Sequence, residues 1–465
     1  SSSRVAASDK MIYNFPFLEA VVQMGNVDQL IEAFGTGANF ELTDSRGNNI
    51  LHVACKKGKP LMVRALLVLT SDLNLWDREN SRGQKPAQVT TDQMIVEMIQ
   101  IFEQIKPIPP FGPNWEASKI LAQKKLALAE VGEEKVLLSL DGGGVRGINA
   151  IQTLIHLEQR LGFPLSEVVD WIGATSLSAF IGISIGQGKS LRAISIDFIR
   201  LIQRVFAKPV NAIPKYPDTP LIADLKANLG SESLASLQKR VVIPAADHEK
   251  YPVKLVNFRS YSPRGASSAD VVFIDPTKCE LWKAAKIACA DPVFLGPSGL
   301  MMDSSIFTPN PSSLLLTDFF RFQKFEQLKG QDNNERIHAF ISVGCGKSPG
   351  HYNFASNKIE HVKEAALPSA LQKKAHTVST FIQQAGNSEG LSSECATELA
   401  HSHDVPFFRL NPRLSDTVPY DDARSMTLIN MMFDTENQLR TSLAYEVDLL
   451  VDLLCTLREK RTNML

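Results

Sequence analysis

The stretch that most constrains the fold of this chain is KVLLSLDGGGVRG, residues 135–147. Its first six residues read as a buried β-strand, because a short apolar run bounded by turn residues suits a strand that is covered on both faces. Three consecutive glycines follow, and the helix-like run NAIQTLIHLEQRLG comes next. A strand, a glycine turn and a helix in direct succession indicate an α/β architecture.

The same alternation of strand-like and helix-like segments continues along the chain. Further strands are predicted over 168–174, 241–247, 253–261, 271–275, 300–303 and 338–346. Helices are predicted from Ser176, over 281–290, over 370–384 and over 435–460. This alternation favours a largely parallel sheet with helices on both faces, and we expect the last two helical stretches to cover that sheet.

Composition narrows the classes of protein to which the chain can belong. Its 465 residues carry a formal net charge of −1, whereas nucleic-acid-binding domains are strongly basic, so no nucleic-acid partner is expected. The six cysteines are scattered without a C-x-x-C pair, which argues against a zinc site or a disulfide framework and suits a reducing compartment. No apolar run reaches the ~18 residues that a membrane-spanning helix needs. The sequence starts SSSRVAASDK, without an initiator methionine, so organelle targeting stays open.

The N-terminal part of the chain contains an internal repeat. The stretch RGNNILHVACKKGKPLMVRALLVL resembles one ankyrin repeat, in which two short helices are separated by a glycine. Gly25 and Gly58 lie 33 residues apart (58 − 25), and Gly47 and Gly83 lie 36 apart (83 − 47), so we expect about three units. In this motif His52 is expected to make a turn hydrogen bond rather than to bind a metal or act in catalysis.

A proline-rich stretch separates this repeat region from the rest of the chain. KPIPPFGPN, which begins at Lys106, has the composition of a loop or linker, and a polar helix-like stretch follows it. We therefore divide the chain into an ankyrin-like segment (1–105), a linker with a helix (106–133) and an α/β domain with its covering helices (134–465).

The glycine-rich loop allows three interpretations. Gly142-x-Gly144-x-x-Gly147 matches a dinucleotide fingerprint, but Asp170, the candidate for the ribose-binding acid, does not end a strand. A tight strand-to-helix turn without a ligand would not need three glycines in a row. Consecutive glycines at a helix N-terminus can instead direct several N–H groups at one oxyanion, which acyl transfer requires. We therefore expect an oxyanion hole in this loop.

A candidate nucleophile follows in the stretch DWIGATSLSAF. Ser176 lies between a predicted strand and a predicted helix, where hydrolases place their serine in a strained G-x-S-x-G turn. Ala174 and Ser178 occupy the two glycine positions, which adds side chains to the turn. Gly182 and Gly186 continue one face of the following helix, so this helix is expected to pack closely against the sheet.

A serine nucleophile needs a base. His338, His351 or His376 could complete a Ser–Asp–His order after Asp303, and the sequence favours none of them. The alternative base is Asp303 itself, in GLMMDSSIFTPNP. A partly desolvated carboxylate becomes basic enough to accept the proton of a serine and to return it to a leaving group.

Together these motifs resemble the patatin-like phospholipases, which combine a D-G-G-G-x-R/K-G loop, a G-x-S-x-G serine and a D-G-G/A aspartate into a Ser–Asp dyad without histidine. The loop stands intact as DGGGVRG, and LWKAAKIACADPVFLGP, ISVGCGKSPG and FFRLNPRL are also similar to stretches of that family. With the ankyrin-like repeats in front, the chain resembles the calcium-independent phospholipases A2 of group VI, beta type. The resemblance implies a patatin-like three-layer α/β/α sandwich preceded by a short α-helical ankyrin-like repeat segment.

The resemblance also implies a chemistry. Ser176 would be the nucleophile and Asp303 the base of a lipid acyl hydrolase that cleaves glycerophospholipid esters through an acyl-serine. The oxyanion hole and the substrate contacts would come from the loop residues Gly142, Gly143, Gly144, Val145, Arg146 and Gly147. Neither a metal nor another cofactor is implied, because the loop takes the place of a Lewis acid.

The family further implies a cytoplasmic enzyme that associates peripherally with a phospholipid membrane surface, binds protein partners through its ankyrin-like repeats and forms a homodimer. The chain departs from the family where ATSLS replaces G-x-S-x-G and where DSS, with Ser304 and Ser305, replaces D-G-G. A nucleophile that is misplaced by about 1 Å can lose ~100-fold in rate. These departures leave open an alternative, a patatin-fold pseudoenzyme that serves as a lipid- or protein-binding scaffold.

Overall fold

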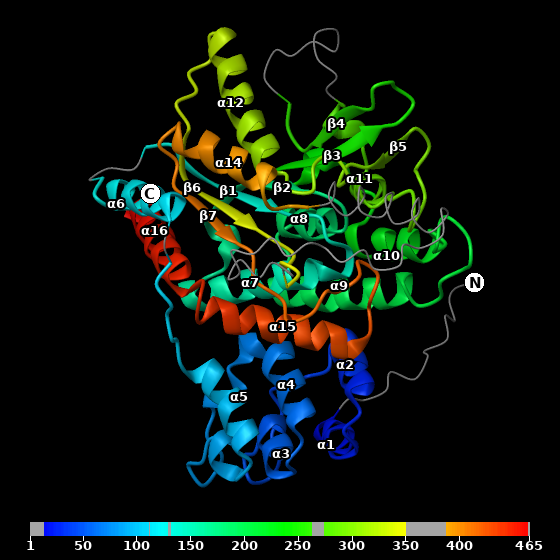
Figure 1. Cartoon of the computed structure of the whole chain (residues 1–465), viewed down its shortest axis with the longest axis vertical. Helices are drawn as coiled ribbons and strands as arrows, with labels where there is room; N and C mark the ends of the chain where they lie inside the picture. The colour runs from blue at the N-terminus through cyan, green and yellow to red at the C-terminus, as the bar shows by residue number, and fades with distance from the viewer. Residues whose placement is uncertain (1–13, 111, 129–131, 263–273, 350–386, 464–465) are drawn as a thin grey trace, which may run out of the picture.

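A seven-stranded sheet forms the centre of the computed structural model, which describes residues 14–110, 112–128, 132–262, 274–349 and 387–463 (Figure 1). The strand order is β4-β3-β2-β1-β6-β7, and β5 pairs with β3. The strands are β1 (Glu134–Leu140), β2 (Val169–Ala174), β3 (Arg240–Asp247), β4 (Lys254–Arg259), β5 (Met301–Asp303), β6 (Arg336–Val343) and β7 (Phe407–Leu410).

The sheet is mixed, with a parallel centre. Strands β3, β2, β1, β6 and β7 run parallel to one another, whereas β4 and β5 pair antiparallel with β3. Because the parallel strands all end at one edge, the loops after β1 and β2 emerge side by side, at the position where α/β proteins place their sites. The predicted, largely parallel α/β architecture is confirmed.

Helices cover both faces of this sheet (Figure 1). One face is covered by α12 (Ser312–Leu328) and α14 (Leu391–His401). On the opposite side lie α7 (Gly147–Leu161), α8 (Ser178–Gly186), α9 (Leu191–Val205), α10 (Thr219–Leu229), α11 (Leu281–Ala288), α15 (Ser425–Leu439) and α16 (Ala444–Asn463). Helix α6 (Pro113–Leu126) packs against α14 and α16. No helix within the described ranges is long and apolar enough to cross a membrane.

Alternate residues of the central strands supply the two halves of the core. Leu137 of β1 and Trp171 of β2 pack with Leu315 of α12, whereas Val136 and Leu138 belong to the larger cluster on the other face. Successive side chains of a strand point to opposite faces, so a strand buried on both sides is apolar throughout. The apolar run after Lys135 therefore specifies a three-layer arrangement.

The N-terminal segment consists of helices on the far side of α15 from the sheet (Figure 1). These helices are α1 (Phe15–Met24), α2 (Val27–Gly35), α3 (Ile50–Lys56), α4 (Pro60–Leu69) and α5 (Gln93–Glu103), with a short 3₁₀ turn η3 (Pro86–Val89) before α5. Helices α2, α4 and α5 contact α15. The helical N-terminal segment is confirmed, while its assignment to ankyrin repeats and the domain boundaries at 105 and 133 stay predictions.

The two turns that lie 36 residues apart in the sequence have similar hydrogen bonds. Asp44 accepts from two backbone N–H groups of its own turn, and Asn80 does the same one turn later. His52 Nε2 lies 2.8 Å from the carbonyl oxygen of Gln84 in the second turn, and its Nδ1 lies 2.9 Å from Oδ1 of Asn49. The expected turn hydrogen bond of His52 is confirmed, and it ties the two turns together.

A buried charge cluster joins the N-terminal segment to α15. Arg440 donates from Nε to Glu436 (2.7 Å) and from Nη1 to the carbonyl oxygen of Phe102 (2.7 Å), and His156 Nδ1 lies 2.8 Å from Glu436. Burial alone would raise the pKa of Glu436, but His156 and Arg440 outweigh that effect and hold the pKa at about 2. The guanidinium also lies over the ring of Phe102, with 5.4 Å between Cζ and the ring centre.

Several predicted elements differ in the structure. The stretch 435–460 is split between α15 and α16, because backbone N–H groups of the linker at Lys106 and Ile108 bind the carbonyl oxygens of Arg440 and Thr441 just after α15. Strand β7 was not predicted, since FFRL is too short for a clear pattern. The helix predicted over 370–384 lies outside the described residues, as does most of the strand predicted over 271–275.

Replacing Arg440 by alanine is expected to lower the free energy of unfolding by about 3–5 kcal/mol, because the buried Glu436 would lose its guanidinium partner and keep only His156 and Gln152. Arg78→Ala is the matched control, since Arg78 pairs with Glu41 at 2.9 Å on the exposed surface and should contribute only about 0–1 kcal/mol. Urea unfolding monitored by circular dichroism measures the free energy of unfolding of both variants. Equal losses in the two variants would show that the buried cluster does not hold the N-terminal segment in place.

Candidate active site

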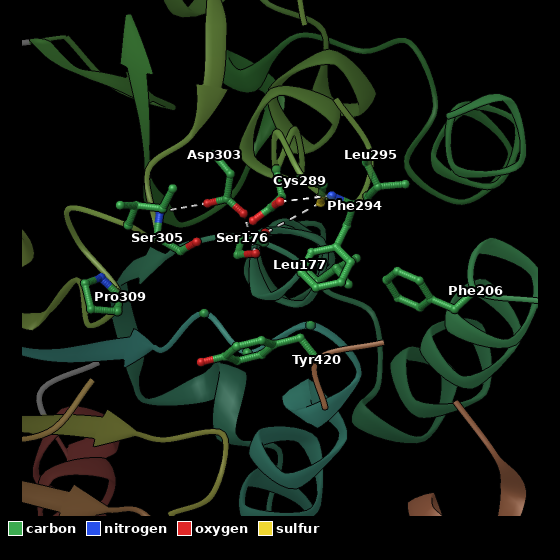
Figure 2. A pocket seen from close by; sticks show the side chains of 15 residues that line it. Ser176, Leu177, Phe206, Cys289, Phe294, Leu295, Asp303, Ser305, Pro309 and Tyr420 are labelled. Atoms are coloured by element: carbon green, nitrogen blue, oxygen red, sulfur yellow. Dashed lines mark hydrogen bonds between the residues drawn. The ribbon is translucent and has the colours of Figure 1, made fainter. Parts of the chain in front are cut away.

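Ser176 occupies a sharp turn between the end of β2 and the start of α8 (Figure 2). Its φ is +55°, which lies in the left-handed region that non-glycine residues seldom adopt. The helix predicted to begin at Ser176 therefore begins two residues later, at Ser178. A strained strand-to-helix turn of this kind exposes the serine hydroxyl at the top of a sheet.

The hydroxyl of Ser176 donates a hydrogen bond of 2.6 Å to Oδ2 of Asp303 (Figure 2). Asp303 is the last residue of β5, and its own N–H binds the carbonyl oxygen of Ala290, which follows α11. The other carboxylate oxygen accepts from the N–H of Ser305 at 2.8 Å. The structure therefore brings the predicted nucleophile and the predicted base together, and it orients the base from both sides.

Burial raises the basicity of Asp303. Its side chain is enclosed, and this desolvation raises the pKa of Asp303 from 3.8 to about 7. The hydrogen bonds from Ser176 and Ser305 act against the shift, and the negative charge of Asp291 adds to it. A carboxylate with a pKa near the working pH can accept the serine proton and give it back.

Of the three candidate histidines, the structure describes only His338, which lies away from Ser176. His338 is buried, and its Nε2 lies 3.4 Å from the carbonyl oxygen of Leu453 while its Nδ1 lies 3.7 Å from Glu134, at the start of β1. Ser176 lies at the opposite edge of the sheet, where the strands end. His351 and His376 lie outside the described residues.

The structure does not fit a dinucleotide-binding site at the glycine loop. Asp170 lies at the start of β2, not at its carboxyl end. Its carboxylate accepts from the N–H of Val136 at 2.8 Å and from Arg461 at 2.7 Å, so it holds strands and α16 together. Asp170 thus has a structural role away from the glycine loop.

The glycine loop offers fewer free donors than the sequence suggested. The N–H of Gly142 binds the carbonyl oxygen of Pro309 at 2.9 Å, and the N–H of Val145 binds that of Tyr420 at 2.8 Å. The N–H groups of Arg146 and Gly147 bind within the loop itself. Among the described residues, the N–H groups of Gly143 and Gly144 have no hydrogen-bond acceptor, and both residues line the pocket beside Ser176. Of the six loop residues that were predicted for the oxyanion hole, only Gly143 and Gly144 therefore have N–H groups available to an oxyanion.

Close contacts require glycine at both positions. A Cβ on Gly143 would lie 2.4 Å from Cβ of Cys345, and Gly144 has a φ of +58° with the carbonyl oxygen of Tyr420 2.2 Å from the position of a Cβ. Neither neighbour can move without shifting backbone or a buried side chain. The two free N–H groups are thus held in place by their surroundings.

A buried ion pair anchors the start of this loop. Arg409 of β7 donates to both carboxylate oxygens of Asp141, at 3.0 and 2.6 Å, and it also binds Glu389. Asp141 is fully buried and immediately precedes the three glycines. The bidentate contact fixes the direction in which the loop leaves β1.

The residues that replace the two family glycines of the turn fit without displacing Ser176. Ser178 is buried, and its hydroxyl donates to the carbonyl oxygen of Asp141 at 2.6 Å. Ala174 has room because the facing residue of α8 is Gly182, where a Cβ would lie 2.9 Å from that of Ala174. The predicted close packing of α8 on the sheet is confirmed, and ATSLS forms the same kind of turn as G-x-S-x-G.

The serines after Asp303 are accommodated as well. The hydroxyl of Ser304 donates to the carbonyl oxygen of Pro244 at 3.0 Å and lies 3.2 Å from the hydroxyl of Thr175. Ser305 lines the pocket and supplies the N–H that binds Asp303. Neither side chain separates Asp303 from Ser176.

A largely apolar pocket opens at Ser176 (Figure 2). Besides the loop and the dyad, it is lined by Leu177, Phe206, Cys289, Asp291, Phe294, Leu295, Ile306, Pro309 and Tyr420. Sequence reasoning did not assign these residues to the site, because they come from five separate segments that meet only through the tertiary fold. Apart from Asp291, these side chains are mostly apolar and fit an acyl chain.

Part of the chain is similar to known proteins. Residues 138–316 match the family model for patatin-like phospholipase. The chain is 27% identical over 453 residues to the intracellular phospholipase A2 of Caenorhabditis elegans, a match that covers 87% of this chain and 41% of that protein. It is 26% identical over 319 residues to the 85/88 kDa calcium-independent phospholipase A2 of Rattus norvegicus, which covers 64% of this chain and 38% of that protein. The chain thus spans about two fifths of the length of these relatives.

The matched segment contains the glycine loop, Ser176 and Asp303, which the structure gathers at one edge of the sheet. A mixed sheet flanked by helices on both faces is the architecture of the patatin fold. Residues 138–316 therefore form a patatin-like phospholipase domain.

Proposed function

We propose that this protein is a calcium-independent, phospholipase A2-like hydrolase that cleaves acyl esters of glycerophospholipids through an acyl-serine intermediate. The hydrogen bond of 2.6 Å between the Ser176 hydroxyl and the buried Asp303 carboxylate carries this proposal. The free N–H groups of Gly143 and Gly144 beside it support an oxyanion hole. Homologues named phospholipase A2 support the substrate class.

In the first half-reaction Asp303 accepts the proton of Ser176 while Oγ forms a bond to the carbonyl carbon of the ester. The carbonyl electron pair moves onto oxygen, and the N–H groups of Gly143 and Gly144 stabilise the resulting oxyanion. When the carbonyl re-forms, the bond to the alcohol oxygen breaks, and Asp303 returns the proton to that leaving oxygen. The products are a lysophospholipid and an acyl-serine.

In the second half-reaction water replaces the alcohol. Asp303 accepts a proton from the water as its oxygen attacks the acyl carbon, and the same two N–H groups bind the oxyanion again. The bond to Oγ then breaks, Asp303 gives the proton back to Ser176, and the free fatty acid leaves. No step in this cycle requires a metal ion from the protein.

The surroundings of the pocket support peripheral membrane binding, while a cytoplasmic location stays a prediction. Val210, Ile213 and Val293 are exposed apolar residues. Backbone hydrogen bonds from Val210 to Lys215 and from Lys215 to Val293 place their segments next to Phe294, which lines the pocket. An apolar rim of this kind can enter the lipid interface and let an acyl chain pass to the serine. Protein partners at the N-terminal helices and a homodimer stay predictions.

The dyad is tested by Ser176→Ala and Asp303→Asn. We expect each variant to lose at least about 1,000-fold of fatty-acid release from mixed phospholipid vesicles in EDTA, because nucleophile and base act as one unit. Ser184→Ala, which removes another buried hydroxyl of α8, is the control and should keep wild-type activity. Release that persists in Ser176→Ala would rule out the proposed nucleophile.

The pH dependence follows from Asp303. Because only the ionised carboxylate accepts the serine proton and its pKa is about 7, kcat/KM should rise about tenfold per pH unit below pH 7 and level off above it. Initial rates with a soluble ester between pH 5 and 9 measure this profile. A rate that is constant across this range would contradict Asp303 as the base.

The raised pKa of Asp303 also predicts how the stability of the fold changes with pH. The folded pKa of about 7 exceeds the unfolded value of 3.8, so the folded state loses stability as pH rises through this interval. A shift of this size corresponds to about 4 kcal/mol, from which a lost hydrogen bond of about 1 kcal/mol is subtracted. Asp303→Asn should therefore be about 1–3 kcal/mol more stable than wild type at pH 8 and not at pH 4, measured by urea unfolding. A less stable variant at pH 8 would contradict the burial of an ionised carboxylate.

The pseudoenzyme alternative is tested by Ser178→Gly, which restores the family motif at that position. Because the turn already forms and Ser178 holds the carbonyl of Asp141, we expect this variant to lose stability by about 1 kcal/mol and to gain no activity. Vesicle hydrolysis and thermal unfolding measure both effects. A large gain in activity from an inert wild type would indicate a disabled turn and favour a binding role.

A further inference from the structure

A second carboxylate lines the pocket beside the dyad. Asp291 follows Ala290, whose carbonyl oxygen binds the N–H of Asp303 at 3.0 Å, so the two aspartates lie on neighbouring segments. Among the described residues that line the pocket, Asp291 and Asp303 are the only ones with charged side chains. The mechanism assigns Asp303 to proton transfer and leaves Asp291 without a role.

One oxygen of Asp291 has a structural task and the other does not. Oδ1 accepts from the N–H groups of Val293 at 2.7 Å and Phe294 at 3.0 Å, which caps the turn after α11. Both side-chain hydrogen bonds of Asp291 within the described ranges go to Oδ1, so Oδ2 takes part in neither. A neutral asparagine caps such a turn as well as aspartate does, so the turn does not explain the charge.

The negative charge of Asp291 is not balanced by a neighbouring cation. Lys215, on the segment paired with Val293, binds Asp421, and Lys286 of α11 lies 3.2 Å from Asp218. No salt bridge to Asp291 is formed within the described ranges. The carboxylate is also partly desolvated, which strengthens its interaction with other charges in the pocket.

Catalysis by the dyad increases the influence of this charge. When Asp303 accepts the serine proton it becomes neutral, while the substrate carbonyl acquires a negative charge. Asp291 then remains as the negative group of the pocket wall, and it repels both the oxyanion and any further anionic group of the substrate. A cationic group on the alcohol portion of the ester would offset this repulsion.

We infer that Asp291 determines specificity for the charge of the headgroup, so that the enzyme prefers esters whose alcohol portion carries an ammonium group over esters with additional negative charge. The inference rests on the proposed function, because it concerns the substrate of the same serine. Zwitterionic glycerophospholipids fit this preference, and lipids with a net negative headgroup do not. Specificity here comes from repulsion of the wrong substrate as much as from attraction of the right one.

The test uses alkyl fluorophosphonates, which react with a catalytic serine without turnover. Three probes share one alkyl chain and carry on the second arm a neutral group, a trimethylammonium group or a sulfonate group. Intact mass spectrometry measures the second-order rate constant of labelling at pH 8.5 and low salt, where carboxylates are ionised. We expect wild type to favour the ammonium probe over the sulfonate probe by about tenfold or more, because charges interact strongly in a partly desolvated site.

Asp291→Asn should reduce this ratio by about tenfold and change labelling by the neutral probe less than threefold, because the cap is kept and only the charge is removed. Asp92→Asn is the matched control, since Asp92 caps α5 through the same pair of N–H groups, at the second and third following residues, outside the pocket. It should leave the ratio unchanged. Raising the salt concentration should shrink the wild-type ratio.

The outcomes separate the two proposals. If the neutral probe labels Ser176 of wild type but the ratio is the same in wild type and Asp291→Asn, the inference about Asp291 is overturned and the proposed function stands. If the ratio falls equally in Asp92→Asn, the effect comes from overall charge, and the inference is overturned as well. If no probe labels wild type at Ser176, the proposed function fails, and the specificity role fails with it.

Discussion

The hydrogen bond between the Ser176 hydroxyl and the Asp303 carboxylate is the interaction on which the functional part of this structure depends. Placing an ionisable carboxylate where water cannot reach it is unfavourable, and the surrounding elements hold it there. Strand β5 ends at Asp303, the turn after α11 binds its backbone, and the β2–α8 turn brings the serine to it. The unfavourable burial is the origin of the raised pKa, on which the proposed role of Asp303 as a base depends.

The second requirement is a rigid pair of N–H groups next to that serine. Gly143 and Gly144 cannot carry side chains, because Cys345 and Tyr420 fill the space. The anchor of the loop is Asp141, which Arg409 binds through its carboxylate and Ser178 through its carbonyl oxygen. Ser178, a departure from the family motif, therefore connects the serine turn to the oxyanion loop. Preorganised donors of this kind need no rearrangement during the reaction.

The sequence predicted the sheet, the glycine loop and the dyad because each is encoded locally. Apolar runs such as the one in β1 specify buried strands, and consecutive glycines specify a turn in which Gly143 and Gly144 have no room for a side chain. It did not predict which loop donors stay free, because Pro309 and Tyr420, which occupy the N–H groups of Gly142 and Val145, are far away in the chain. The pocket lining was missed for the same reason, since Phe206, Phe294 and Tyr420 meet only through the tertiary fold.

The departures from the family motif suggested a distortion of the site that the structure does not contain. ATSLS and DSS suggested a distorted turn, yet Ser176 keeps a φ of +55° and a hydrogen bond to Asp303. The compensation at Ala174 comes from Gly182, eight positions later in the next helix (182 − 174), and a motif that ends at Ser178 does not include it. A motif compares neighbours in sequence, whereas steric compensation acts between neighbours in space.

The most direct test of the central claim is to look for the covalent intermediate. The protein is mixed with a slowly deacylating long-chain ester, quenched in acid within seconds and digested, and the peptides are examined by tandem mass spectrometry. The account predicts one acyl group on the peptide that contains Ser176, located on that serine. Fatty-acid release without an acyl group on Ser176, or with the acyl group on another residue, would contradict it.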